Sequence, residues 1–237
     1  MTQIAVLNGG SALKNIDAAF LAEAVNNQMA EFCRDWHLDA WPVVLYASAA
    51  GLPAEDIYIF EYVDQLDQPG ALAYHSVDAL GRPYARMLPP ADPLDASDLS
   101  HEALETRGDP TCDRWVKMPD GTELAVEVCD PVQGAASEYS VAVTVLGETR
   151  QIKLSDYAMP SLFDELGKAP FSRQGGPTRP FGMAAGGYEA IIDPSGNEHD
   201  VYARLRYASL AGAASVHRKL ADPGSRVLRR LRGKRAA

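Results

Sequence analysis

The first part of the chain alternates between apolar segments and turn-forming residues. The apolar run QIAVLN at residues 3–8 ends at a Gly-Gly pair, which is typical of a short strand followed by a turn. Ser11 then suits a helix N-cap, and apolar residues recur at helical spacing from Leu13 to Phe32. Three runs rich in β-branched and aromatic residues follow between turn formers, and they predict strands at 43–47, 56–63 and 71–77.

Two more elements follow before the middle of the chain. Residues 84–88 come after a Gly-Arg-Pro turn and predict either a fourth short strand or an extended edge segment. A proline-rich crossing leads to Ser97 or Ser100, either of which suits the N-cap of a helix that contains His101. The predicted order is β-α-β-β-β-α, which indicates an α+β fold with a long N-terminal helix and a second, polar helix.

The remainder of the chain predicts shorter elements. Strand-like runs separated by turns indicate a small antiparallel C-terminal region, with strands at 122–130, 140–147 and 148–155. A proline- and glycine-rich loop precedes a strand at 188–193. An Ala-rich segment at 200–222 predicts a helix that ends at Asp-Pro-Gly. The predicted organisation is one domain over residues 1–195, a helical extension over 196–222 and a basic tail over 223–237.

Composition narrows the class of protein. In a chain of 237 residues, 46% hydrophobic residues suffice for a substantial core. The first residues lack the pattern of a signal peptide, and no run of 18 apolar residues occurs, so we expect cytoplasmic localisation and no membrane partner. The three cysteines contain no C-x-x-C pair, which argues against a disulfide framework and against a cysteine zinc ribbon.

The charge is distributed unevenly along the chain. Residues 218–237 carry eight Lys and Arg residues against Asp222 alone, a charge of +7, whereas the whole chain has a formal charge of −10. The body before residue 218 is therefore at −17 and would repel nucleic acid. We expect the tail to mediate self-association or assembly with an acidic partner, with nucleic acid as the second possibility.

The stretch DASDLSHEALETRGDP carries the candidate chemistry, because it contains His101, Glu102 and Glu105 in the spacing H-E-x-x-E. On a helix, His101 and Glu105 share a face and can hold one metal ion from adjacent turns. Glu102 is rotated by about 100° from His101, which suits a general base acting on a metal-activated water. The alternative is an acidic surface helix that happens to contain a histidine.

A metal site needs further donors. If AVEVCDP forms a strand, Val126 and Val128 face one side while Glu127 faces the other, and Asp130 follows at the strand end. Glu127 is the first candidate for the third ligand and Asp130 the second; the alternative is a solvent-facing acidic strand end. His75, next to the expected edge segment, is a candidate for contacting the substrate or the transition state, or else a hydrogen-bonded structural histidine.

Several blocks of the sequence resemble a known group of proteins. The blocks AYHSVDALGRPYARM, SDLSHEALETRGDPTCDRW, ELAVEVCDP and IKLSDYAMPSLFD are similar to those of uncharacterised bacterial and tailed-phage proteins with a zincin-like metallopeptidase core. The similarity covers roughly residues 40–195. It implies a helix over a mixed sheet, zinc on that helix with His101 and Glu105 as ligands, Glu102 as the base, and a substrate peptide along the edge strand.

One position departs from the zincin pattern, and this leaves two functions open. A carboxylate stands where the second histidine of H-E-x-x-H would be, so Mn²⁺, Fe²⁺ or Ca²⁺ are alternatives to zinc. The leading hypothesis is a metal-dependent hydrolase that acts on a peptide or protein substrate. The alternative is a phage virion structural or assembly protein that keeps the fold with a weakened or inactive metal site, in which case it would be located in the virion.

Overall fold

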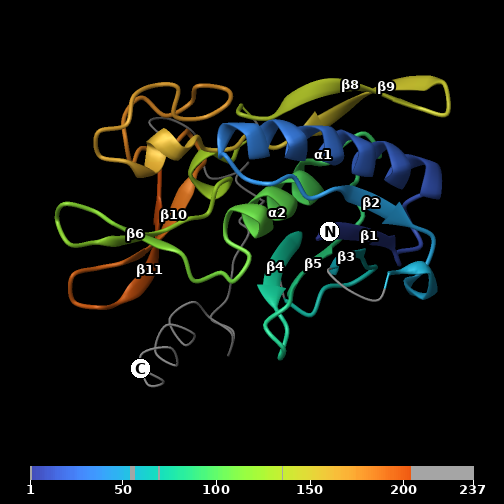
Figure 1. Cartoon of the computed structure of the whole chain (residues 1–237), viewed down its shortest axis with the longest axis horizontal. Coiled ribbons are helices and arrows are strands. Elements are labelled where there is room, and N and C mark those ends of the chain that lie inside the picture. Colours follow the sequence, from blue (N-terminus) through green and yellow to red (C-terminus); the bar gives the residue numbers. More distant parts are fainter. Residues whose placement is uncertain (1, 54–56, 69, 135, 204–237) are drawn as a thin grey trace.

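The computed structural model describes residues 2–53, 57–68, 70–134 and 136–203 and has a mixed α+β architecture. Its largest sheet has the order β2-β1-β3-β5-β4 (Figure 1). The strands are β1 (Gln3–Asn8), β2 (Val43–Tyr46), β3 (Ile57–Tyr62), β4 (Ala73–Val77) and β5 (Pro83–Met87). The first three and β5 are parallel, whereas β4 is antiparallel to β5. A short 3₁₀ turn, η1 (Ala49–Gly51), follows β2.

The structure confirms the first of the two alternatives for residues 84–88, because they form the short strand β5 and not an edge segment. Strand β5 lies between β3 and β4, and the edge strands of the sheet are β4 and β2. The carboxylate of Asp78 accepts hydrogen bonds from the backbone N–H groups of Leu80 and Arg82, which closes the turn between β4 and β5. Ala85 and Met87 of β5 are buried, and this favours the inner position.

Helix α1 (Asn15–Asp35) covers the sheet and buries the apolar residues whose spacing predicted it, among them Phe20 and Phe32. The sequence predicted Ser11 as the N-cap of this helix, and that prediction is wrong. Lys14 occupies that position, while Ser11 donates its N–H and its hydroxyl to Asp64. On its other side α1 packs against the hairpin of β8 (Tyr139–Val145) and β9 (Glu148–Leu154) (Figure 1).

Helix α2 (Ser97–Gly108) packs against α1, β4, β5 and β9. Neither predicted serine is its N-cap, which is Ala96. Instead, the Asp95 carboxylate accepts hydrogen bonds from the N–H and hydroxyl of Ser97, and Ser100 Oγ accepts one from Ser155 N–H inside the molecule. The helix is buried along nearly its whole length although many of its residues are polar. Such a helix must satisfy its polar groups internally.

A second sheet of four antiparallel strands has the order β11-β10-β7-β6, and it lies beside α2 in Figure 1. Its strands are β6 (Trp115–Lys117), β7 (Glu123–Ala125), β10 (Tyr188–Ile192) and β11 (Glu198–Tyr202). Two 3₁₀ turns, η2 (Asp130–Val132) and η3 (Pro160–Phe163), lie between β7 and β10. The antiparallel region predicted from strands at 122–130, 140–147 and 148–155 is therefore divided, because β7 belongs to this sheet whereas β8 and β9 form a separate two-stranded sheet.

The strand predicted at 122–130 was too long. Strand β7 ends at Ala125, because the N–H of Glu127 donates to the carbonyl of Ala125 and turns the chain. Val126, Glu127 and Val128 are all buried, so the alternation expected for a strand does not occur. The segment from Glu127 to Asp130 instead passes through the interior and enters η2 at Asp130.

The structure describes only the first residues of the helix predicted at 200–222. Residues 200–202 lie in β11 rather than in the predicted helix, and the β10–β11 hairpin extends past the domain boundary predicted at residue 195. The rest of the predicted helix and the basic tail lie outside the described residues. Neither helix of the described part is long and apolar enough to cross a membrane.

Candidate metal centre

Six polar side chains converge in the interior between α2, the edge strand β4 and the segment that leads into η2. They are His75 of β4; His101, Glu102 and Glu105 of α2; and Glu127 and Asp130 of the segment. None is more than 4% exposed. These are the six residues that the sequence analysis selected, and residues separated by as many as 55 positions meet in one cluster.

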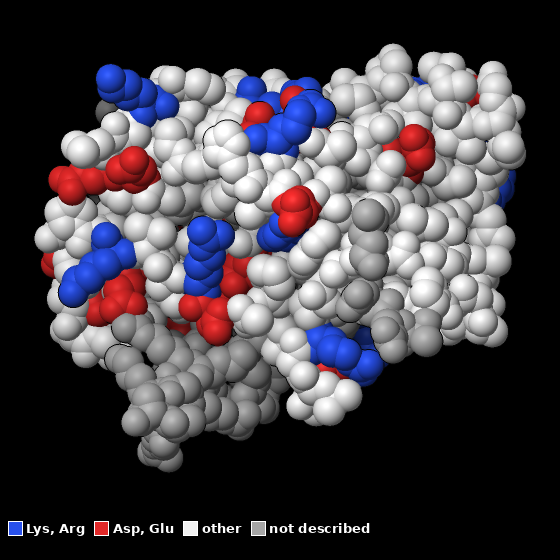
Figure 2. Space-filling model, in the orientation of Figure 1, with Lys and Arg blue, Asp and Glu red and all other residues white. Residues whose placement is uncertain are grey.

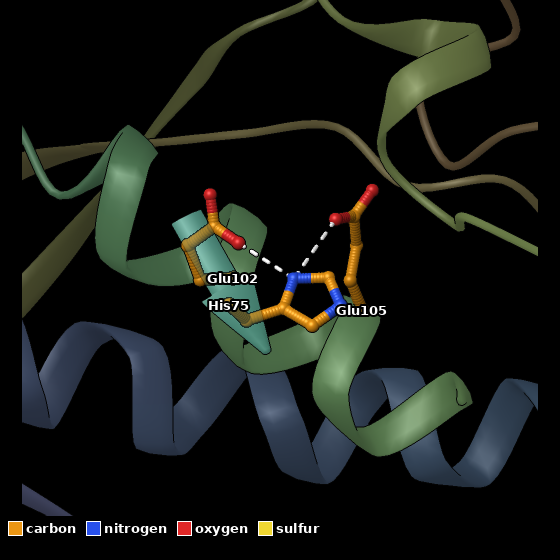
Figure 3. Close-up of side chains that lie close together, drawn as sticks. All are labelled: His75, Glu102 and Glu105. Carbon is orange, nitrogen blue, oxygen red and sulfur yellow. Dashed lines mark hydrogen bonds and ion pairs between the residues drawn. The ribbon is translucent and has the colours of Figure 1, made fainter. Parts of the chain in front are cut away.

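The local structure explains how they meet. His75 stands on β4 opposite Ala85 of β5, and β4 packs against α2, so its imidazole faces the helix. On α2, Glu102 and Glu105 are three positions apart and both reach that imidazole, one on each side in Figure 3. The turn after Ala125 carries Glu127 and Asp130 into the interior instead of along a sheet.

The first group of contacts surrounds His75. Its Nδ1 lies 2.7 Å from Oε2 of Glu102 and 3.4 Å from Oε2 of Glu105 (Figure 3). Its other ring nitrogen, Nε2, lies 3.9 Å from Oε2 of Glu127. Both nitrogens of this imidazole therefore face carboxylates.

The second group surrounds His101. Its Nε2 lies 3.0 Å from Oδ1 of Asp130 and 3.3 Å from Oε1 of Glu105. The other oxygen of Asp130, Oδ2, is buried and accepts no hydrogen bond from the described residues. Glu105 thus belongs to both groups, with a different oxygen in each.

The pKa values follow from burial and from these neighbours. Burial alone would lower the pKa of His101, but Glu105 and Asp130 outweigh it and raise this pKa well above its usual value. Burial would raise the pKa of Glu102, but the hydrogen bond and charge of His75 lower it. Without a metal ion, Glu102 is therefore ionised and His101 is protonated, and a cation bound by His101 would displace its proton.

The arrangement has the donor chemistry of a metal site. His75, Glu102 and Glu105 form one set of three buried donors that can hold an ion, and His101, Glu105 and Asp130 form another. Imidazole nitrogens and carboxylate oxygens are the donors used by Zn²⁺, Mn²⁺ and Fe²⁺. The structure groups Asp130 with His101 and Glu105, while Glu127, the first candidate for a third ligand, lies next to His75.

Tyr188 of β10 also belongs to this region, although no sequence pattern predicted it. Burial and then the charges of Asp130, Glu105 and Glu127 raise the pKa of its phenol well above the usual value, which places this side chain in the field of the cluster. The neighbouring Gly187 allows the approach, since a Cβ there would lie 2.2 Å from the carbonyl oxygen of Pro131. The pair Gly186-Gly187 before this strand indicates a sharp bend of the chain, but it does not indicate which residues lie near Tyr188.

The molecular surface looks different from this interior. On the face shown in Figure 2, acidic side chains lie among basic ones rather than in a single acidic patch.

Comparisons with known proteins gave no match to a protein-family model, to a curated protein or to a solved structure.

Proposed function

We propose that this protein is a metal-dependent hydrolase of peptide or amide bonds with a zincin-like centre. The observation that carries the proposal is the buried cluster itself: two imidazoles and four carboxylates, each at most 4% exposed, converge on the helix with the H-E-x-x-E motif. Burying ionised groups is costly unless they are paired or bind a metal. A cation that meets several of them at once offsets that cost.

The arrangement of the elements supports a zincin-like mode of action. In such a site the metal-binding helix lies beside the edge strand along which a substrate peptide binds. Here α2 packs against β4, which is an edge strand of the mixed sheet and runs antiparallel to its neighbour. A peptide paired to β4 would have its backbone beside the side chains of α2.

The residues would divide the work as follows. His101, Glu105 and Asp130 would hold the cation, zinc first and Mn²⁺ or Fe²⁺ as alternatives. The cation would supply Lewis acidity toward a substrate carbonyl. Glu102, whose pKa is lowered by His75, is ionised and able to accept a proton, the role that the motif assigns to it. The Tyr188 phenol stays protonated and can donate a hydrogen bond to a developing oxyanion.

Two measurements on the purified full chain test this proposal. Elemental analysis after dialysis against Zn²⁺ or Mn²⁺ should find bound metal in the wild type. His101→Ala should lose the ion held by His101, Glu105 and Asp130. Mass spectrometry of a broad peptide library should find cleavage that stops when a chelator is added. His199→Ala is the matched control, because His199 is exposed on β11, far along the chain from the cluster. Metal content that His101→Ala leaves unchanged would overturn the assignment of the ligands.

One observation favours a second function, that of a structural or assembly protein with an inactive metal site. The six side chains are buried, and a catalytic metal needs an accessible coordination position. The two functions differ in one result. If metal binds and stabilises the protein but the peptide library stays intact, the structural function replaces hydrolysis.

A further inference from the structure

We infer that the centre holds two divalent cations bridged by the carboxylate of Glu105. This inference rests on the proposed metal centre and deepens it, since the motif on α2 by itself suggested a single ion. It also changes the role expected for Glu102, from a base beside the metal to a ligand.

The bridge is visible in the contacts of Glu105. Its Oε2 faces Nδ1 of His75 at 3.4 Å, and its Oε1 faces Nε2 of His101 at 3.3 Å. One carboxylate therefore presents its two oxygens to two different imidazoles. This is the orientation of a bridging carboxylate, and Glu105 is fully buried, so its side chain is held by packing.

The distances within each set suit donors of one ion. Two atoms that each lie about 2.1 Å from an ion, at an angle of about 90–110°, are about 3.0–3.4 Å apart. Around His75 the distances to its carboxylates are 2.7 and 3.4 Å, and around His101 they are 3.0 and 3.3 Å. Small shifts of these side chains would therefore be enough to admit an ion at each imidazole.

The two sets match each other in composition. Each has one imidazole and one carboxylate of its own, Glu102 in the first and Asp130 in the second, and both share Glu105. Dinuclear carboxylate centres are built in this way, with histidines and glutamates on packed elements. One nitrogen and few oxygens per ion favour Zn²⁺, Mn²⁺ or Fe²⁺, whereas Ca²⁺ prefers six to eight oxygens.

The charges of the six side chains also favour two ions. Four buried carboxylates outnumber the two imidazoles that they face. Imidazole binds metal in its neutral form, and two divalent cations would then match the four carboxylates.

Glu127 acts on the centre through His75. When Nδ1 of this imidazole binds a metal, the proton is on Nε2, and Nε2 faces the Glu127 carboxylate at 3.9 Å. A carboxylate on the far side of a metal-binding histidine fixes the tautomer and orientation of the ring. Glu127 is accordingly a positioning residue for the His75 ion.

The test counts the ions. The full chain, stripped with a chelator, is titrated with Mn²⁺, and the bound metal is measured by elemental analysis and by electron paramagnetic resonance. The wild type should bind two ions per chain, and their spectrum should be that of an exchange-coupled pair. Glu102→Gln and Asp130→Asn should each retain one ion with the spectrum of isolated Mn²⁺. Glu189→Gln removes a buried carboxyl that lies outside both sets and should retain two coupled ions.

Other outcomes overturn the inference in distinguishable ways. One ion in the wild type rejects the dinuclear centre and leaves the proposed hydrolase with a mononuclear one. Two ions without exchange coupling reject the Glu105 bridge. No bound ion rejects the proposed function as well. The spectrum of the wild type decides between these cases even where a variant fails to fold.

Discussion

Carboxylates in two regions of this molecule have different partners. Along the β8–β9 hairpin they pair with Arg and Lys: Arg150 lies 2.7 Å from Asp17, and Lys153 lies 2.5 Å from Asp95 and 2.9 Å from Glu138. In the buried centre they pair with His75 and His101. Arg and Lys keep their protons at neutral pH and have no lone pair for a metal, whereas imidazole can lose its proton and bind one. The hairpin pairs are fixed, while those of the centre can be exchanged for a cation.

Burial alone does not produce this difference. Glu189 on β10 is also buried, and burial raises its pKa to about 7, against a smaller lowering by Arg179. Glu102 is buried too, yet His75 lowers its pKa. The difference between these two carboxyls therefore comes from the imidazole beside Glu102.

Removal of the proposed metal should have the largest effect on the buried region. At a free metal concentration of about 1,000 times Kd, binding stabilises the folded state by about 4 kcal/mol. In a domain of this size, 1 kcal/mol shifts the thermal midpoint by about 2–4 °C. Calorimetry should thus show a fall of about 8–16 °C when a chelator is added.

The control for this measurement is the same chelator already saturated with Zn²⁺, which should leave the midpoint unchanged. If the stripped and the metal-loaded proteins unfold at the same temperature, the buried imidazoles are not a cation site. The two regions would then not differ in the ability to bind a metal.

Substitution of Tyr188 should separate catalysis from binding. Tyr188→Phe removes a hydroxyl whose pKa is raised by burial and by nearby carboxylates, and which is therefore protonated. Loss of one donor to a developing oxyanion typically lowers kcat by about 10²-fold or more. Peptide cleavage should fall by that factor while the bound metal is unchanged. Equal cleavage by the variant and the wild type would remove Tyr188 from the mechanism.

Substitution of Glu127 should weaken the centre without removing a ligand. Glu127→Gln keeps the size of the side chain but loses the charge that faces Nε2 of His75. Loss of a carboxylate behind a metal-binding histidine typically lowers metal affinity by about 10–100-fold. Competition with a chromophoric chelator measures this change. A variant that loses a whole ion at saturating metal would instead identify Glu127 as a ligand.

The sequence selected the residues of the site but not the contacts between them. The spacing of Phe20 and Phe32 identified α1, and the H-E-x-x-E spacing selected three members of the cluster, because both patterns are local in a helix. The contact between His75 and Glu102 spans 27 positions and depends on the pairing of β4 with β5, which no local pattern determines. Which carboxylate joins which imidazole was therefore beyond prediction.

The segment from Glu127 to Asp130 shows a second limit. Alternating valines predicted a strand, but the bond from Glu127 N–H to the Ala125 carbonyl ends it, and both valines are buried. Because this segment is buried on all sides, the alternation of apolar and polar residues along it does not reveal its conformation. Tyr188 was missed because its partners lie on other elements.

Substitution of Glu189 tests whether a buried carboxyl without a neighbouring imidazole is protonated. Its pKa of about 7 lies above the usual value for glutamate, so the folded state holds a proton that the unfolded state releases between about pH 4.5 and 7. Stability contributed by this group is therefore present at low pH and is lost as the pH rises through 7. Glu189→Gln should abolish that loss and gain about 1–2 kcal/mol over the wild type between pH 5 and 8, since one pKa unit is worth about 1.4 kcal/mol and residual solvent contact reduces the effect.

Urea unfolding at several pH values measures this difference. Asp120→Asn is the control, because Asp120 is exposed and its pKa is lowered by the backbone and side chain of Thr122. A wild type whose stability is the same at pH 5 and pH 8, after allowance for the control, would show that Glu189 is solvated in solution.

The smallest effect is expected for the ion pairs of the hairpin. Lys153 lies 2.9 Å from Glu138, but its side chain is 38% exposed, so water and salt screen the attraction. A double-mutant cycle of Lys153→Gln and Glu138→Gln isolates their coupling from the bond of Lys153 to Asp95. For exposed pairs this coupling is typically about 0.2–1 kcal/mol. It should decrease further in about 1 M salt, where the Debye length is near 3 Å. A coupling above about 2 kcal/mol that resists salt would mean that the hairpin pair behaves like a buried one, and the distinction between fixed surface pairs and an exchangeable interior cluster would then no longer rest on burial and partner type.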